Sequence, residues 1–218
     1  MIKNIIFDLD GTLIDSAEDI INCLKSAYST CAALPHLSIT TEDIGPPVQA
    51  MIDKLSPHLS DEQRKNILDN FRLQYDNSEL ENTVLYPGIM KLLKELAELK
   101  CNVYIATNKP FHITSRIIDK LIKELIKDYI TFDKIKDNKL NKSEMVKCLI
   151  ECNSLDYSTT AVIGDQESDI KAGYANNISS IAVKYGYGDE LSLLKSNASY
   201  LIDSVDELSV LLHKLCGG

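Results

Sequence analysis

The sequence lacks several features that mark particular classes of protein. No apolar run approaches the roughly 20 residues that span a bilayer, and the N-terminal run MIKNIIF is too short for the apolar part of an export signal. Basic residues are too few for the basic surface that binds nucleic acid or anionic membranes, because the formal net charge is −9. We therefore expect a cytoplasmic protein with no nucleic-acid or membrane partner. We also expect either a monomer or a homodimer.

The cysteines also lack a pattern. The six cysteines form no CxxC pair and no metal-ligand spacing with the four histidines, which argues against a zinc site or a disulfide scaffold. The hydrophobic content of 44% and charged content of 25% are those of an ordinary globular protein. A chain of 218 residues is long enough for one large domain or for a domain with an insertion.

Short apolar runs recur along the chain, with helical patterns between most of them. The predicted strands lie at 2–7, 102–107, 129–133, 160–165, 179–183 and 199–203. Between them, apolar residues recur at helical spacing, as in the stripe Ile89, Leu92, Leu93, Leu96 and Leu99. Strands that alternate with helices predict an α/β fold with a doubly wound parallel sheet of the Rossmann type.

One stretch departs from this alternation, because residues 16–83 show helical patterns and no convincing strand. Its first helix is expected to begin at Ser16, with Asp19 completing a Ser-x-x-acid cap pattern. We therefore expect a small all-helical domain of residues 16–83, inserted after the first strand of an α/β domain that comprises 1–15 and 84–218.

Polar residues follow several of the predicted strands or begin the next helix. In chain order they are Asp8, Asp10, Gly11, Thr107, Asn108, Lys142, Asp165 and Asp169. Open α/β sheets bind ligands outside the carboxyl ends of their strands. We therefore expect these groups to converge at one edge of the sheet.

Each of these residues taken alone has an ordinary structural explanation. A DxDG turn is about as often a plain strand end as part of an active site. Thr107 alone is explained as a packed residue of a strand. Lys142 fits a solvated lysine at a helix start, and Asp165 and Asp169 fit acids favoured by a helix dipole. Four acids packed together without a cation are costly, however, because like charges raise one another's pKa. A bound divalent metal relieves that cost, and oxygen ligands of this kind suit Mg²⁺.

Taken in order, the motifs resemble those of haloacid dehalogenase superfamily phosphatases. They are DLDGT at 8–12, ATN at 106–108, Lys142, and GDQESD at 164–169. The match spans nearly the whole chain, the helical insertion resembles the C1 cap of that superfamily, and the segment KYGYGDEL (184–191) is similar to phosphoglycolate phosphatases. The resemblance implies a Mg²⁺-dependent phosphatase that forms an aspartyl-phosphate and acts on a small phosphorylated metabolite.

The resemblance carries over to the paired aspartates. It implies that Asp8 is the nucleophile, and that Mg²⁺ is bound by the Asp8 carboxylate, the Asp10 main-chain carbonyl and Asp165. Asp10 points to the same side of an extended strand as Asp8. It is therefore placed to protonate the leaving-group oxygen and then to deprotonate the attacking water.

The remaining motif residues are expected to bind the phosphoryl group. Thr107 and the main-chain N–H groups near Gly11 and Asn108 would hydrogen-bond its oxygens, and Lys142 would neutralise charge on them. Asp169 is expected to orient Lys142 or a water on the metal, without binding the metal itself.

Two questions stay open: which substrate is hydrolysed, and which of two lysines belongs to the site. Lys139 competes with Lys142, since the chain lacks the Lys-Pro-x-Pro pattern common at this motif. Ile44 and Gly45 are candidate substrate-binding residues, but loop 41–48 has no arginine to bind a substrate carboxylate, which weakens phosphoglycolate itself as the substrate. The alternatives are a sugar-phosphate mutase, a pyrophosphatase, or a non-catalytic phosphate-binding protein.

Overall fold

The chain forms two compact units in a computed structural model that describes residues 1–30, 38–134 and 140–217. One unit comprises Met1–Ile14 and Leu85–Gly218, and the other comprises Asp15–Val84. In the described ranges, no helix is both long enough and apolar enough to cross a membrane.

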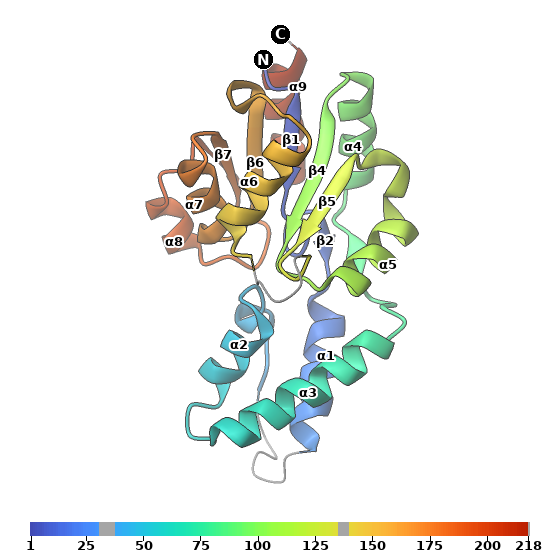
Figure 1. Cartoon of the computed structure of the whole chain (residues 1–218), viewed down its shortest axis with the longest axis vertical. Helices are drawn as coiled ribbons and strands as arrows, with labels where there is room; N and C mark the ends of the chain where they lie inside the picture. The colour runs from blue at the N-terminus through green and yellow to red at the C-terminus, as the bar shows by residue number, and fades with distance from the viewer. Residues whose placement is uncertain (31–37, 135–139, 218) are drawn as a thin grey trace. The chain divides into compact units, whose positions relative to one another are not determined.

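A parallel six-stranded sheet forms the centre of the larger unit (Figure 1), in the order β5-β4-β1-β6-β7-β8. The strands are β1 (Asn4–Phe7), β4 (Asn102–Thr107), β5 (Asp128–Thr131), β6 (Thr160–Gly164), β7 (Ser179–Val183) and β8 (Tyr200–Ile202). Strand β1 is buried along its whole length, as its nearly continuous apolar sequence predicts for a strand covered on both faces. The doubly wound α/β fold expected from the alternation is thus confirmed.

Helices lie on both sides of this sheet (Figure 1). They are α4 (Ile89–Glu98), α5 (Phe111–Leu121), α6 (Lys142–Cys152), α7 (Glu167–Ala175), α8 (Glu190–Lys195) and α9 (Val205–Gly217), with short 3₁₀ helices at Lys123–Leu125 and Tyr157–Thr159. Helices α6 and α7 pack on the sheet face that carries Ile6, Ala106 and Val162, where they bury one apolar cluster. This packing fixes the positions at which α6 and α7 begin.

Strands β4, β1 and β6 are neighbours and end within two residues of one another. Phe7, the last residue of β1, is paired with Ile105 in β4 and with Ile163 in β6. The residues that follow these strands therefore reach the same edge of the sheet.

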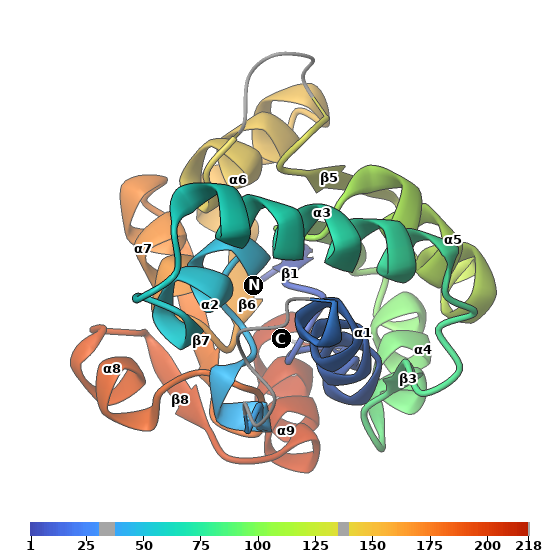
Figure 2. The same cartoon turned by 90° about the horizontal axis from the view of Figure 1, so that it is seen from below.

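The smaller unit is built from helices. These are α1 (Ala17–Ser29), α2 (Val48–Leu55) and α3 (Asp61–Asn77), with a 3₁₀ helix at Thr41–Asp43. Helices α1 and α3 pack side by side (Figures 1 and 2). Two-residue strands β2 (Ile14–Asp15) and β3 (Val84–Leu85) form a separate small sheet.

The expected cap at the start of α1 does not form. Ser16 makes no side-chain capping hydrogen bond. The Asp19 carboxylate instead accepts hydrogen bonds from the Thr83 hydroxyl at 2.7 Å and from the Asn82 side-chain amide at 3.2 Å. The local pattern misled because the partners of Asp19 lie more than 60 residues further along the chain.

Asp19→Ala should therefore lower the free energy of unfolding by about 1–3 kcal/mol, because the hydroxyl of Thr83, a residue only 2% exposed, would lose its acceptor. Urea denaturation followed by circular dichroism would measure the change. Glu18→Ala, at the exposed neighbouring position of the same helix, is the matched control and should have little effect. Equal losses in the two variants would contradict the structural role of Asp19.

Candidate active site

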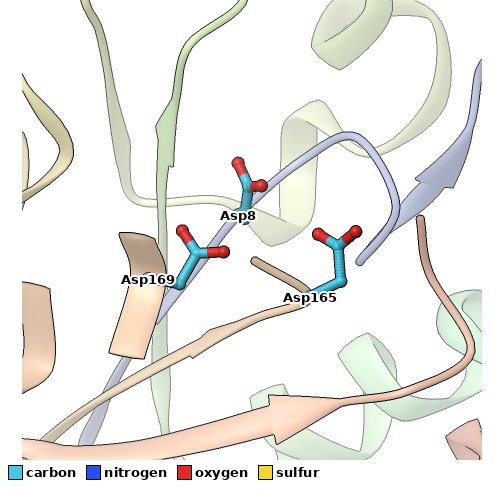
Figure 3. Close-up of side chains that lie close together, drawn as sticks. All are labelled: Asp8, Asp165 and Asp169. Atoms are coloured by element: carbon cyan, nitrogen blue, oxygen red, sulfur yellow. The ribbon is translucent and has the colours of Figure 1, made fainter. Parts of the chain in front are cut away.

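Three aspartates bring their carboxylates together at the edge of the sheet (Figure 3). Asp8 follows β1, Asp165 follows β6, and Asp169 lies in the first turn of α7. One oxygen from each lies within 4.8 Å of the others. All three side chains are buried, and Asp165 and Asp169 are wholly so. Asp8 thus shares one site with two aspartates that lie far from it in the sequence.

A single buried ammonium group bridges two of these carboxylates. The Nζ of Lys142 lies 2.7 Å from Asp8 Oδ1 and 2.9 Å from Asp169 Oδ1, and it donates a hydrogen bond to the Ala106 carbonyl at 3.0 Å. Burial alone would lower the pKa of Lys142, but the Asp169 and Asp8 carboxylates raise it above its usual range. The lysine therefore stays protonated and holds Asp8 and Asp169 in place.

The position of Lys142 follows from the start of its helix. Asn141 accepts a hydrogen bond from the Glu144 N–H at 3.0 Å, and the Glu144 carboxylate accepts one from the Asn141 N–H at 2.8 Å. This capping box makes Lys142 the first residue of α6. The main chain of Lys142 is thus fixed by the capped start of α6, and its side chain extends from there to Asp8 at the end of β1.

Negative charge exceeds positive charge among these four residues. Burial raises the pKa of Asp8 well above its usual range, and although Lys142 opposes this, the Asp169 and Asp165 carboxylates add to it. Burial, reinforced by Asp169, raises the pKa of Asp165 to about 6. A divalent cation would favour the ionised forms, and clustered carboxylate oxygens are the ligands of hard cations. The residues therefore fit a divalent metal ion.

Asp165 is held by a dense set of donors. Its Oδ1 accepts a hydrogen bond from the Thr12 hydroxyl at 3.2 Å, and its Oδ2 accepts bonds from the Tyr187 N–H at 2.8 Å and the Gln166 side-chain amide at 3.2 Å. Gly11 has a φ of 79°, and a Cβ at this position would lie 2.3 Å from Asp165 Oδ2. Glycine is thus required for the DLDGT loop to approach Asp165 so closely.

Sequence reasoning missed the Thr12 and Tyr187 contacts to Asp165. Tyr187 belongs to the segment 184–191, whose glycines allow it to lie against the site: a Cβ at Gly188 would stand 1.6 Å from the Asp165 carbonyl oxygen. The pair of glycines flanking Tyr187 was the available signal, because such residues mark close approaches of main chain.

Asp10 lies beside a second lysine, which sequence reasoning also missed. The Nζ of Lys109 lies 2.7 Å from Asp10 Oδ1. Lys109 follows Thr107 and Asn108 at the end of β4, and its N–H donates to the buried Thr107 hydroxyl at 3.1 Å. Its place directly after a strand end was a signal, but the direction of a long side chain is not readable from sequence.

Three other candidates come from other parts of the sequence. Ile44 and Gly45 belong to the helical unit, where Ile44 is buried and Gly45 has a φ of 118°. Their contact with a substrate stays a prediction. Lys139, the competitor of Lys142, lies outside the described residues.

Residues 5–183 match the haloacid dehalogenase-like hydrolase family. The chain belongs to this family. It is 28% identical to the phosphoglycolate phosphatase of Vibrio parahaemolyticus over 222 residues, which cover 95% of this chain and 94% of that protein. It is 27% identical to a 5′-nucleotidase of Pseudomonas aeruginosa over 189 residues, which cover 86% and 85% of the two chains.

A solved structure agrees with this assignment. The crystal structure of a predicted phosphatase from Clostridium acetobutylicum matches with a TM-score of 0.85 and 28% identity, over 98% of this chain and 99% of that one. The resemblance inferred from the four motifs is thus confirmed. Family membership and these relatives place the enzyme among the phosphoric monoester hydrolases.

Binding of a divalent cation should weaken as the pH falls through about 6. Above this pH the Asp165 carboxylate is ionised and available; below it a proton competes, because the pKa of Asp165 is raised to about 6. The apparent affinity should then fall by roughly tenfold per pH unit. Calorimetric titration with Mg²⁺ or Mn²⁺ between about pH 5 and 8 would measure this. An affinity that does not change with pH would contradict a carboxylate site.

Proposed function

We propose that this enzyme is a Mg²⁺-dependent phosphatase that hydrolyses a small phosphomonoester through an aspartyl-phosphate on Asp8. The observation that carries this proposal is the Asp8 carboxylate beside the buried Lys142 ammonium, 2.7 Å away, at the carboxyl end of the central strand. Ligands of open α/β sheets bind at this edge. The names of the relatives support a phosphatase similar to phosphoglycolate phosphatases. We propose that it acts in the cytoplasm, as a monomer or homodimer.

Asp8 would act as the nucleophile on phosphorus. A carboxylate is a weak nucleophile, and the negative charge of a phosphoester repels it. Lys142 reduces that repulsion and holds Asp8 Oδ1 by an ion pair. Bound Mg²⁺, held by Asp8, Asp165 and the Asp10 carbonyl, would supply charge screening and alignment of the phosphoryl group.

Asp10 would transfer the protons. Its side chain is 20% exposed, twice the value for Asp8, so it is the more accessible of the pair. We propose that it donates a proton to the leaving-group oxygen and then takes one from the water that cleaves the intermediate. Thr107 and the N–H groups near Gly11 and Asn108 would bind the phosphoryl oxygens, while Asp169 keeps Lys142 oriented.

The helical insertion would decide which phosphomonoester is hydrolysed. We propose that residues 16–83 act as a C1 cap domain on the core of 1–15 and 84–218, with Ile44 and Gly45 among the substrate-binding residues. The alternatives are a mutase, which would transfer the phosphoryl group to a second sugar position, and a pyrophosphatase.

A substrate panel tests the proposal. Phosphate release should be detected with at least one of 2-phosphoglycolate, sugar phosphates and nucleoside 5′-monophosphates when Mg²⁺ is present, and it should stop when the metal is chelated. Isomerisation of a sugar phosphate without release would indicate the mutase, and release from pyrophosphate alone would indicate the pyrophosphatase. No turnover of any substrate would reject the enzyme mechanism.

Asp8→Asn should lower kcat by a factor on the order of 10⁴ or more, because an amide cannot form the acyl-phosphate. Steady-state phosphate release on the best substrate of the panel would measure it. Asp206→Asn, at an exposed position at the start of α9, is the matched control and should keep the wild-type rate. Near-wild-type turnover by Asp8→Asn would show that the nucleophile is another group.

Lys142→Ala should lower kcat by about 10²-fold or more, because it removes the cation that faces Asp8. Lys139→Ala should be close to wild type. Both variants would be compared on the same substrate, with circular dichroism to verify their folding. A larger loss in Lys139→Ala would reverse the assignment of the two lysines.

A further inference from the structure

The Asp10–Lys109 ion pair is a second charged pair at the same edge of the sheet. Lys109 Nζ and Asp10 Oδ1 are 2.7 Å apart, within the range of a charge-assisted hydrogen bond. The lysine side chain is only 4% exposed, whereas the Asp10 side chain is 20% exposed. The ammonium is therefore covered by protein, and the carboxylate is the partner that solvent or a ligand can reach.

The main chain at Lys109 is restrained on both sides. Its N–H donates to the Thr107 hydroxyl at 3.1 Å, and its carbonyl accepts a hydrogen bond from the Thr114 hydroxyl at 3.3 Å. The next residue, Pro110, precedes the first residue of α5 and disfavours a helical conformation at Lys109. The main chain of Lys109, in the connection between β4 and α5, is thus held by hydrogen bonds while its side chain pairs with Asp10.

The two buried lysines serve different aspartates. Lys142 lies between Asp8 and Asp169, and Lys109 pairs with Asp10. Asp8 and Asp10 are two residues apart on one strand end, so without separate partners their carboxylates would repel each other. Each lysine therefore fixes one member of the pair.

We propose that Lys109 is the positioning residue for Asp10, holding its carboxyl group in the direction needed to protonate the leaving-group oxygen. This inference rests on the proposed function, in which Asp10 is the acid and base of the reaction. Lys109 acts through Asp10 and needs no contact with the substrate. A small displacement of a reacting group can cost about 10²-fold in rate.

Leaving groups of different basicity test this role. An alkoxide leaves only with a proton, so an alkyl phosphate such as glycerol 2-phosphate needs Asp10, whereas the nitrophenolate of p-nitrophenyl phosphate leaves without one. The ratio kcat/KM covers the steps up to departure of the leaving group, so it isolates the acid step from the later attack of water. A substitution of Lys109 should therefore affect the two substrates differently only if it misplaces Asp10.

Lys109→Met should lower kcat/KM for the alkyl phosphate by about 10²-fold and change it for p-nitrophenyl phosphate by no more than a few-fold. Lys109→Arg, which keeps the charge, should recover part of the loss. Lys91→Met, at an exposed lysine of α4 paired with Glu95, is the matched control and should behave as wild type on both substrates. Equal losses on both substrates would overturn the proposal.

A double-mutant comparison covers the case in which Lys109→Met alone does not fold. Asp10→Asn/Lys109→Met removes both charges and should have nearly the same kcat/KM as Asp10→Asn, because Lys109 acts through Asp10. A further loss of tenfold or more in the double variant would overturn the proposal. A rise in the KM of Lys109→Met that is confined to 2-phosphoglycolate would also overturn the proposal, because it would indicate that Lys109 binds the substrate carboxylate.

The two levels of inference fail separately. If the wild-type enzyme hydrolyses neither the panel substrates nor p-nitrophenyl phosphate, the proposed function falls, and the role of Lys109 falls with it. If the wild-type enzyme is active but Lys109→Met does not distinguish the two leaving groups, only the role of Lys109 is overturned.

Discussion

Crowding of buried negative charge is the constraint on which the site depends. Asp8, Asp165 and Asp169 lie within a few ångströms of one another, so Asp169 and Asp165 disfavour ionisation of Asp8, and Asp169 disfavours ionisation of Asp165. The protein compensates in two ways: the Lys142 ammonium lies between two of the carboxylates, and hydrogen-bond donors surround the third. What remains uncompensated is a local excess of negative charge that suits a divalent cation.

The strand order of the sheet explains how charged residues from separate strands and helices are brought together. Strands β4, β1 and β6 are adjacent and parallel, so the residues that follow each of them lie at the same edge of the sheet. Helices α6 and α7 begin at that edge as well, so Lys142 and Asp169 project from the first turns of helices whose apolar faces are packed on the sheet. Core packing thus sets the geometry of the charged groups.

The sequence was sufficient for the fold and for the residues at the strand ends, because both follow from local pattern: alternating strands and helices, and acids placed directly after apolar runs. It was not sufficient for interactions between distant segments. Asp19 was predicted to complete a helix cap but bonds to Thr83, and the place of Lys109 after a strand end did not reveal its pairing with Asp10. Which way a long side chain turns depends on neighbours in space, and no local periodicity encodes them.

The contact between Thr12 and Asp165 joins residues 153 positions apart. Closing so long a loop costs chain entropy before any contact can offset it, and contacts of this range generally form late in folding. The three-carboxylate cluster therefore depends on β6: a chain in which β6 has not yet joined β1 lacks Asp165 beside Asp8. A divalent cation that needs both Asp8 and Asp165 would therefore bind only after β6 has joined β1, and its binding would report that step of folding.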